Sequence, residues 1–215
     1  MLWKVLLGLF TVFSHSSSPG LSPETEYIPT ESGPQTAEEA EIARAALHDN
    51  NLYGGDIVLP DGWNETDASI AGIRDIKFRW FEGLDKAIVP FVIDQSSYGI
   101  RNIIYQAIEQ YHRHTCVRFV PRTNQTDYIR IFSGNGCWSA VGRSGGRQDL
   151  SLGKGCGYIG LVIHQLGHAI GLFHEHQRSD RDNYVTIYRQ NAIPSQLHNF
   201  AKMDKSKELI FTPYE

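Results

Sequence analysis

The segment HQLGHAIGLFHEH, at residues 164–176, constrains the fold of this chain more than any other segment. His164 and His168 are four residues apart, so on a helix they lie on one face and can offer two imidazoles to a single metal ion. A third ligand has to approach from another direction. Gly171 suits the required break, because glycine accepts a left-handed conformation without steric cost. The segment therefore predicts a buried helix, a glycine turn and a third ligand in His174.

Three neutral imidazole nitrogens with an open fourth position are typical of a catalytic rather than a structural zinc site. The alternative is that these residues are ordinary core histidines. The chain has 9 His and 20 Gly among 215 residues, too few for three histidines and a glycine to match the required spacings readily by chance. We therefore expect one Zn²⁺ per chain.

The N-terminal residues MLWKVLLGLFTVF combine one lysine with an apolar run that is too short to span a bilayer. Small residues follow it, and the pattern predicts a signal peptide at residues 1–16, secretion, and no membrane anchor. A buried N-terminal helix is the alternative. The composition, 41% hydrophobic and 20% charged, suits one globular domain plus an extension. A net charge of −4 gives no basic footprint, so we expect no nucleic-acid partner.

The cysteines and the glycosylation motifs are interpreted for a secreted chain. In an oxidising compartment Cys116, Cys137 and Cys156 give one disulfide and one cysteine left over, and three pairings are possible. Asn64 and Asn124 each begin an N-x-Thr motif and are possible glycosylation sites.

The rest of the chain alternates between runs of strand length and amphipathic stretches of helix length. Residues 17–36 are rich in Ser, Pro, Glu and Thr, which is typical of a linker. We expect helices at residues 37–48, within SSYGIRNIIYQAIEQYHRHT and at residues 157–172, and strands in AIVPFVID, CVRFV, DYIRIF, CWSAVG and QDLSL. Strand, helix, several strands and a helix in this order predict a mixed α+β domain.

The pattern HxxxHxxGxxHE, followed by HQRSDRDNYV, resembles the metzincins and specifically the astacin family of secreted zinc endopeptidases. TCVRFV, GCWSAVGR, SLGKGCGYIG, NFAKM and TPYE also resemble astacin segments, in the family's order, so the resemblance extends from about residue 80 to residue 215. It implies an astacin-like zincin fold, with a mixed sheet, two long helices and an active-site helix that ends at a glycine turn. It also implies zinc as the cofactor and an extended peptide or protein as the substrate.

The resemblance further implies that residues 17–74 are a propeptide and residues 75–215 the metallopeptidase domain. Such a leader blocks the zinc through an aspartate in an FxGD-like motif, which residues 53–56 match at Gly55 and Asp56. A turn residue after a glycine is the other interpretation of Asp56. Release of the leader would require cleavage by a trypsin-like protease, for which Arg74 offers a basic site.

Two further roles come from the resemblance alone. It implies a disulfide between Cys137 and Cys156, with Cys116 pairing to a cysteine farther along, and it implies that Glu175 binds the new N-terminus once the leader is removed. The family continues past TPYD with a Met-turn and a tyrosine, whereas this sequence ends at Glu215. We therefore expect a metallopeptidase domain that is incomplete at its C-terminus and lacks the partner of Cys116.

At the position of the family's catalytic glutamate this chain has Gln165. A glutamate takes a proton from the activated water and later gives it to the leaving amine, whereas a carboxamide accepts no proton at ordinary pH. Loss of a general base lowers the rate by ~10²- to 10⁴-fold. We therefore expect a secreted zinc endopeptidase precursor whose peptide cleavage is absent or very weak.

Two alternatives remain open at this point. One is an inactive pseudoprotease that captures zinc and extended peptides. The resemblance implies that a substrate pairs as an added strand along the sheet edge near residues 137–142, and such pairing needs no glutamate. The other is an active protease whose natural transcript encodes glutamate at position 165 and continues beyond residue 215.

Overall fold

The computed structural model describes residues 33–61, 76–81 and 86–202. The expected signal peptide, Asn64, Arg74 and the C-terminal segment TPYE lie outside the described residues. None of the helices that the described residues form is long and apolar enough to cross a membrane.

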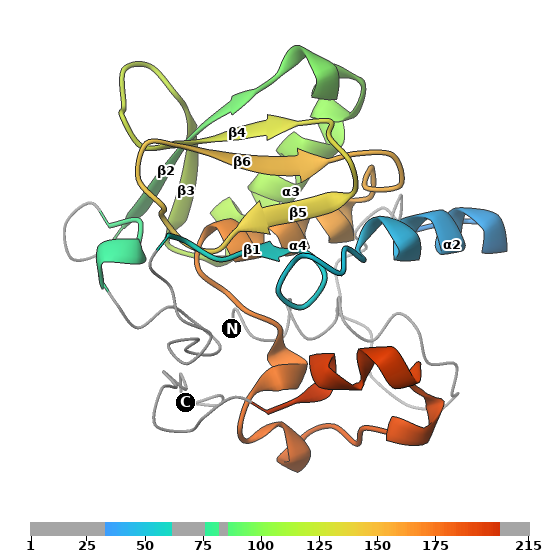
Figure 1. The fold of residues 1–215 in the computed structure, drawn as a ribbon. Coiled ribbons are helices and arrows are strands. Elements are labelled where there is room, and N and C mark those ends of the chain that lie inside the picture. The colour runs from blue at the N-terminus through green and yellow to red at the C-terminus, as the bar shows by residue number, and fades with distance from the viewer. Residues whose placement is uncertain (1–32, 62–75, 82–85, 203–215) are drawn as a thin grey trace, which may run out of the picture.

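A six-stranded mixed sheet lies at the centre of the molecule (Figure 1). The strand order is β1-β5-β6-β4-β2-β3, in which β5 and β6 are antiparallel and the four other neighbouring pairs are parallel. The bounds are β1 Ile57–Val58, β2 Ala87–Ile93, β3 Val117–Pro121, β4 Tyr128–Phe132, β5 Cys137–Ala140 and β6 Arg147–Leu152. The five predicted strands are thereby confirmed. β4 shows why such runs form strands, because its alternate residues Ile129 and Ile131 are fully buried.

Two helices, α3 (Arg101–His114) and α4 (Ile159–Ala169), pack against one face of the sheet (Figure 1). The predicted apolar stripe of α3 is buried at Ile104, Ala107, Ile108 and Tyr111. Each large apolar side chain buried in this way contributes about 1.5–3 kcal/mol. The Tyr111 hydroxyl donates a 2.8 Å hydrogen bond to the Ile163 carbonyl of α4. The sheet, through α3, therefore supports the helix that carries the histidine segment.

Residues 33–61, the described part of the expected propeptide and called the leader below, form helix α2 (Ala37–Ala46) and strand β1. Strand β1 is not among the predicted elements. A capping box begins α2: the Thr36 hydroxyl accepts from the Glu39 amide, and the Glu39 carboxylate accepts from the Thr36 amide. β1 pairs in parallel with β5. At two residues it is too short for a periodic pattern, so the sequence predicts only a loop there.

Short 3₁₀ helices make up the remaining regular structure. They are Ile76–Phe78, Gln95–Ile100, Glu175–Gln177, Arg181–Asn183, Arg189–Asn191 and Pro194–Phe200. The last four lie apart from the sheet, on the side of the histidine segment (Figure 1). The buried Arg181 side chain joins three of these four, because its Nη1 donates to the carbonyls of His176 (2.7 Å) and Phe200 (2.6 Å).

Candidate metal centre

Helix α4 presents two of the three histidines from a buried position. His164 and His168 lie one turn apart, with their ring centroids at 4.4 Å. The helix ends at Ala169 with Ile170 as its C-cap, and Gly171 follows with φ +109°, a conformation that glycine adopts without strain. The chain then turns back and brings the His174 ring to 4.9 Å from the His168 ring. The three histidines therefore meet as the spacing predicts.

A backbone contact orients the ring of His168. The Nδ1 of His168 lies 2.7 Å from the carbonyl oxygen of Leu172, which can only accept a hydrogen bond. His168 Nδ1 therefore donates this hydrogen bond, and Nε2 faces the centre of the cluster, 2.9 Å from His164 Nε2. Such a hydrogen bond on the outer nitrogen is the usual support of a histidine that binds a metal.

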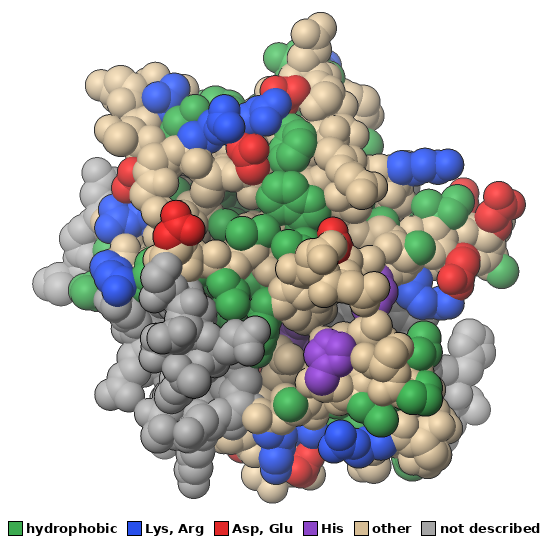
Figure 2. All heavy atoms as spheres, in the orientation of Figure 1, with side chains coloured by type: hydrophobic (Ala, Val, Ile, Leu, Met, Phe, Trp, Pro, Cys, Tyr) green, Lys and Arg blue, Asp and Glu red, His purple; other side chains and the backbone are tan. Residues whose placement is uncertain are grey.

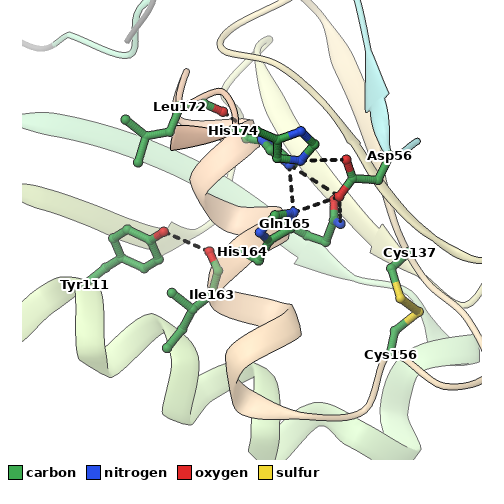
Figure 3. Close-up of polar contacts among 10 residues, drawn as sticks. Asp56, Tyr111, Cys137, Cys156, Ile163, His164, Gln165, Leu172 and His174 are labelled. Carbon is green, nitrogen blue, oxygen red and sulfur yellow. Dashed lines mark hydrogen bonds and ion pairs between the residues drawn. A yellow bond between two sulfur atoms is a disulfide. The ribbon is translucent and has the colours of Figure 1, made fainter. Parts of the chain in front are cut away.

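Asp56 of the leader reaches the same centre (Figure 3). Its Oδ2 lies 2.7 Å from the Nε2 of His164 and 3.4 Å from the Nε2 of His168, and its Oδ1 lies 3.0 Å from the Nε2 of His174. The side chain is only 2% exposed. One ligand atom from each of these four residues lies within 4.8 Å of the others. These four ligand atoms are therefore close enough together to bind one metal ion.

Two glycines before Asp56 allow this approach. Gly54 has φ +62°, and a Cβ built on it would lie 2.7 Å from the Nδ1 of His174. Gly55 has φ +98°, and a Cβ there would lie 2.9 Å from the Leu47 carbonyl oxygen. Both contacts are too close for a side chain, so the two glycines let the leader backbone pass against the histidine.

Burial and charge set the protonation of these groups. Burial lowers the pKa of His164 and of His174, so both rings are neutral at pH 7, as metal binding requires. Burial alone would raise the pKa of Asp56, but the three neighbouring histidines outweigh it and hold that pKa well below its usual range. The site therefore combines neutral imidazoles at His164 and His174 with the ionised carboxylate of Asp56.

Gln165 follows the first histidine on α4 and is fully buried. Its Nε2 donates a 2.9 Å hydrogen bond to the Oδ2 of Asp56, and its Oε1 has no hydrogen-bond partner among the described residues. The sequence indicated that this amide lies at the site. No local pattern signals its contact with Asp56, because the two residues are 109 positions apart.

The donor set fits a zinc ion. Imidazole nitrogens and a carboxylate oxygen are common zinc ligands, and four of them suit its tetrahedral geometry. Asp56 Oδ1 is buried and makes no hydrogen bond to any described residue, although it points at His174. A buried carboxylate oxygen without a partner is costly, and a cation at the centre of the cluster would satisfy it.

The other predicted residues lie outside this cluster. Cys137 and Cys156 form a disulfide, which joins the start of β5 to the loop before α4. Cys116 is free and exposed. The Glu175 carboxylate, next to the third histidine, accepts from Arg178 Nη1 at 3.1 Å. Asn124 is exposed, as a glycosylation site must be.

Charged side chains on one face of the molecule do not form a field of one sign. On the face shown in Figure 2, Lys and Arg side chains alternate with Asp and Glu side chains, and histidines are visible in the lower half. Several of these charges are paired, among them Arg130 with Asp94 at 2.7 Å and Arg143 with Asp127 at 3.0 Å.

Known proteins match the part of the chain that carries the centre. The model of the Astacin peptidase family matches residues 74–215. High choriolytic enzyme 2 of Oryzias latipes is 47% identical over 130 residues, which are 60% of this chain and 46% of that protein. Zinc metalloproteinase nas-8 of Steinernema carpocapsae is 38% identical over 174 residues, which are 78% of this chain and 40% of that protein. This chain thus spans less than half the length of these two relatives.

A solved structure is similar as well. It is high choriolytic enzyme 1, a hatching enzyme zinc-protease from Oryzias latipes, with a TM-score of 0.55 and 42% identity. The likeness covers 60% of this chain and 66% of that chain. It confirms the expected fold class, a mixed sheet with helices.

Proposed function

Because the chain belongs to the astacin family of peptidases, we propose that it is the secreted precursor of a zinc metalloendopeptidase whose peptide hydrolysis is absent or very weak. Members of this family are zinc enzymes that act on peptides or proteins, and the described residues contain one group that could hold a metal ion. The observation that carries the proposal is that group, formed by Asp56, His164, His168 and His174, with Gln165 beside it.

In the proposed site the three histidines bind one zinc ion, and Asp56 is the fourth ligand while the leader is in place. The neutral state of His164 and His174 supports this assignment, as does the Nδ1 hydrogen bond that orients His168. When bound, zinc supplies a Lewis acid that activates a water molecule and polarises a peptide carbonyl. A carboxylate in the fourth position excludes that water, so the leader-bound form is latent.

The leader also covers the sheet edge that a substrate would use. The Ser139 amide donates to the Asp56 carbonyl at 3.0 Å, and the Val141 amide donates to the Val58 carbonyl at 3.2 Å. An extended peptide that adds a strand to β5 needs these same amides. Peptide binding therefore requires release of the leader, which we assign to a trypsin-like protease acting near Arg74.

After release, Glu175 would bind the new N-terminal ammonium group. In the leader-bound form its carboxylate accepts from Arg178, so the new contact would add to this ion pair or replace it. The signal peptide at residues 1–16 places the precursor in the secretory pathway.

A second candidate function is supported by Gln165. Its carboxamide can hydrogen-bond a ligand but cannot act as a general base. A chain with intact histidines, an intact β5 edge and no base would capture zinc and extended peptides without turnover. Hydrolysis of peptides by the leader-free protein separates the two candidates.

Metal content tests the site itself. The purified chain should contain about one Zn²⁺ per molecule, and His168→Ala should abolish binding because only two imidazoles remain. His114→Ala, at an exposed position on α3, is the matched control and should retain the metal. Unchanged zinc in His168→Ala, measured by elemental analysis after dialysis, would contradict the assignment.

A further inference from the structure

The side chain at position 165 determines which kind of group can occupy the fourth position of the cluster. Gln165 Nε2 donates a hydrogen bond of 2.9 Å to the Oδ2 of Asp56, and both groups are excluded from solvent. The amide therefore acts together with the histidines to hold a carboxylate. Hydrogen bonds to charged groups are the stronger ones in proteins, particularly where water is absent.

A glutamate at the same position has no N–H to donate to the Asp56 carboxylate. Its carboxylate would lie about 2.9 Å from that of Asp56, if it adopted the conformation of Gln165. At that distance the two groups would repel each other where Gln165 now makes a hydrogen bond. A glutamate accepts a hydrogen bond from a water molecule in the fourth position, whereas a glutamine donates one to an anion.

We propose that Gln165 makes this metal site selective for carboxylates, with Asp56 as its resident ligand. The proposal rests on the proposed zinc site and names the class of group that this site retains. One carboxylate oxygen takes the hydrogen bond from the amide. The other oxygen, which corresponds to Oδ1, faces His174 Nε2 at 3.0 Å.

The strand next to the site defines how such a carboxylate is presented. Asp56 lies directly before β1, and the neighbouring residue Ile57 pairs with Ser139 of β5. A peptide on this edge would bring an acidic side chain, or a C-terminal carboxylate, to the place of Asp56. In this chain the resident leader supplies the carboxylate from the same molecule, so a peptide added from outside has to displace it.

Chemical rescue by acetate tests this selectivity in the full chain. Asp56→Ala removes only the carboxylate group, and acetate restores it as a separate molecule. At constant ionic strength, acetate should raise the melting temperature and the zinc affinity of zinc-loaded Asp56→Ala. Acetate should bind zinc-loaded Asp56→Ala at least about tenfold more tightly than it binds the double variant Asp56→Ala, Gln165→Glu. Acetamide, the neutral analogue, should not show this preference for Gln165.

Equal acetate affinity in the two variants, or no acetate effect in either, would overturn the proposal. Failure of the parent chain to bind zinc is a different result, because it overturns the proposed function instead. The rescue experiment thus separates the two ideas.

A double-mutant cycle covers the case in which Asp56→Ala does not fold, and it requires no metal. Gln165→Glu alone should lower the midpoint of urea unfolding. The double variant Asp56→Asn, Gln165→Glu should have a higher midpoint than the sum of the two single effects predicts. In that variant the amide at position 56 can donate to the glutamate at position 165, so the hydrogen bond is kept with its direction reversed. The coupling should correspond to about tenfold or more in the folding constant. Additive effects of the two substitutions would overturn the proposal.

Discussion

At the scale of single residues, a carboxamide and a carboxylate at position 165 fill nearly the same volume but treat a proton differently. Gln165 is buried on a helix whose backbone is set by Val162, Ile163, Leu166 and Ala169, all of which pack in the core. A change at this position therefore alters the chemistry of the site with little effect on the path of the helix.

Gln165→Glu should restore peptide hydrolysis in the full-length protein after the leader has been cut. The gain in kcat should be at least ~10²-fold with little change in KM, because a general base acts on the transition state rather than on binding. Gln165→Met, which has no base, is the control and should stay inactive. The assignment fails if the parent protein already cleaves peptides as fast as the glutamate variant.

At the scale of elements, the leader is held by close backbone contacts rather than by a large apolar core. Helix α2 passes the disulfide-linked loops, where a Cβ on Gly155 would lie 2.9 Å from the Ile42 carbonyl oxygen. The Tyr53 ring packs edge-on against Phe173 at 6.1 Å. Because glycines allow these approaches, single added methyl groups should loosen the leader.

Gly54→Ala should weaken leader binding through the clash with His174, by more than the ~1 kcal/mol that a left-handed alanine costs by itself. Gly145→Ala is the matched control, because Gly145 also has a positive φ, of +83°, but an added Cβ there would meet no atom within 4 Å. Limited proteolysis should cut the leader faster in Gly54→Ala than in Gly145→Ala. Equal cutting rates would show that the contact with His174 does not hold the leader.

Cysteine chemistry gives a second prediction at this scale. Alkylation without a reducing agent should label Cys116 and leave Cys137 and Cys156 unlabelled, because the first is exposed and free and the others are joined. Peptide mapping should then find the fragment that contains β5 linked by a disulfide to the fragment that contains the loop before α4. A fragment that links Cys116 to Cys137 would contradict the pairing.

At the scale of the whole molecule, folding and metal binding share the same histidines. Burial lowers the pKa of His164 and His174, and it lowers that of His176 from 6.5 to about 4. Between these pH values the unfolded chain binds protons that the folded chain does not, so the free energy of unfolding decreases as the pH falls. The low pKa of Asp56 adds a further loss only below its ordinary value of 3.8.

The urea midpoint should therefore fall steadily from pH 7 to pH 5, and zinc should be released over the same interval, because protonated imidazoles do not bind metal. The exposed variant His114→Ala should give the same curve as the parent chain. A midpoint that does not change between pH 7 and pH 5 would show that these histidines are not buried in the neutral form.

The sequence by itself determined the elements and most of the site. The β-branched runs predicted the strands from β2 to β6, the apolar stripe predicted α3, and the spacing of His164, His168 and Gly171 predicted the helix that ends beside the metal centre. These features depend on local periodicity and on the conformational freedom of glycine, which neighbouring residues reveal. The pairing of Cys137 with Cys156 came from the family resemblance instead, because local sequence holds no information about disulfide partners.

Only the tertiary structure decided how the leader meets the domain. β1 has two residues and no pattern of its own, and its place beside β5 depends on contacts between segments that are far apart in the chain. The same packing brings Asp56 within hydrogen-bond distance of Gln165, so that the amide holds a carboxylate. A residue type at one position shows which chemistry is available, but the group on which that chemistry acts is set by long-range packing.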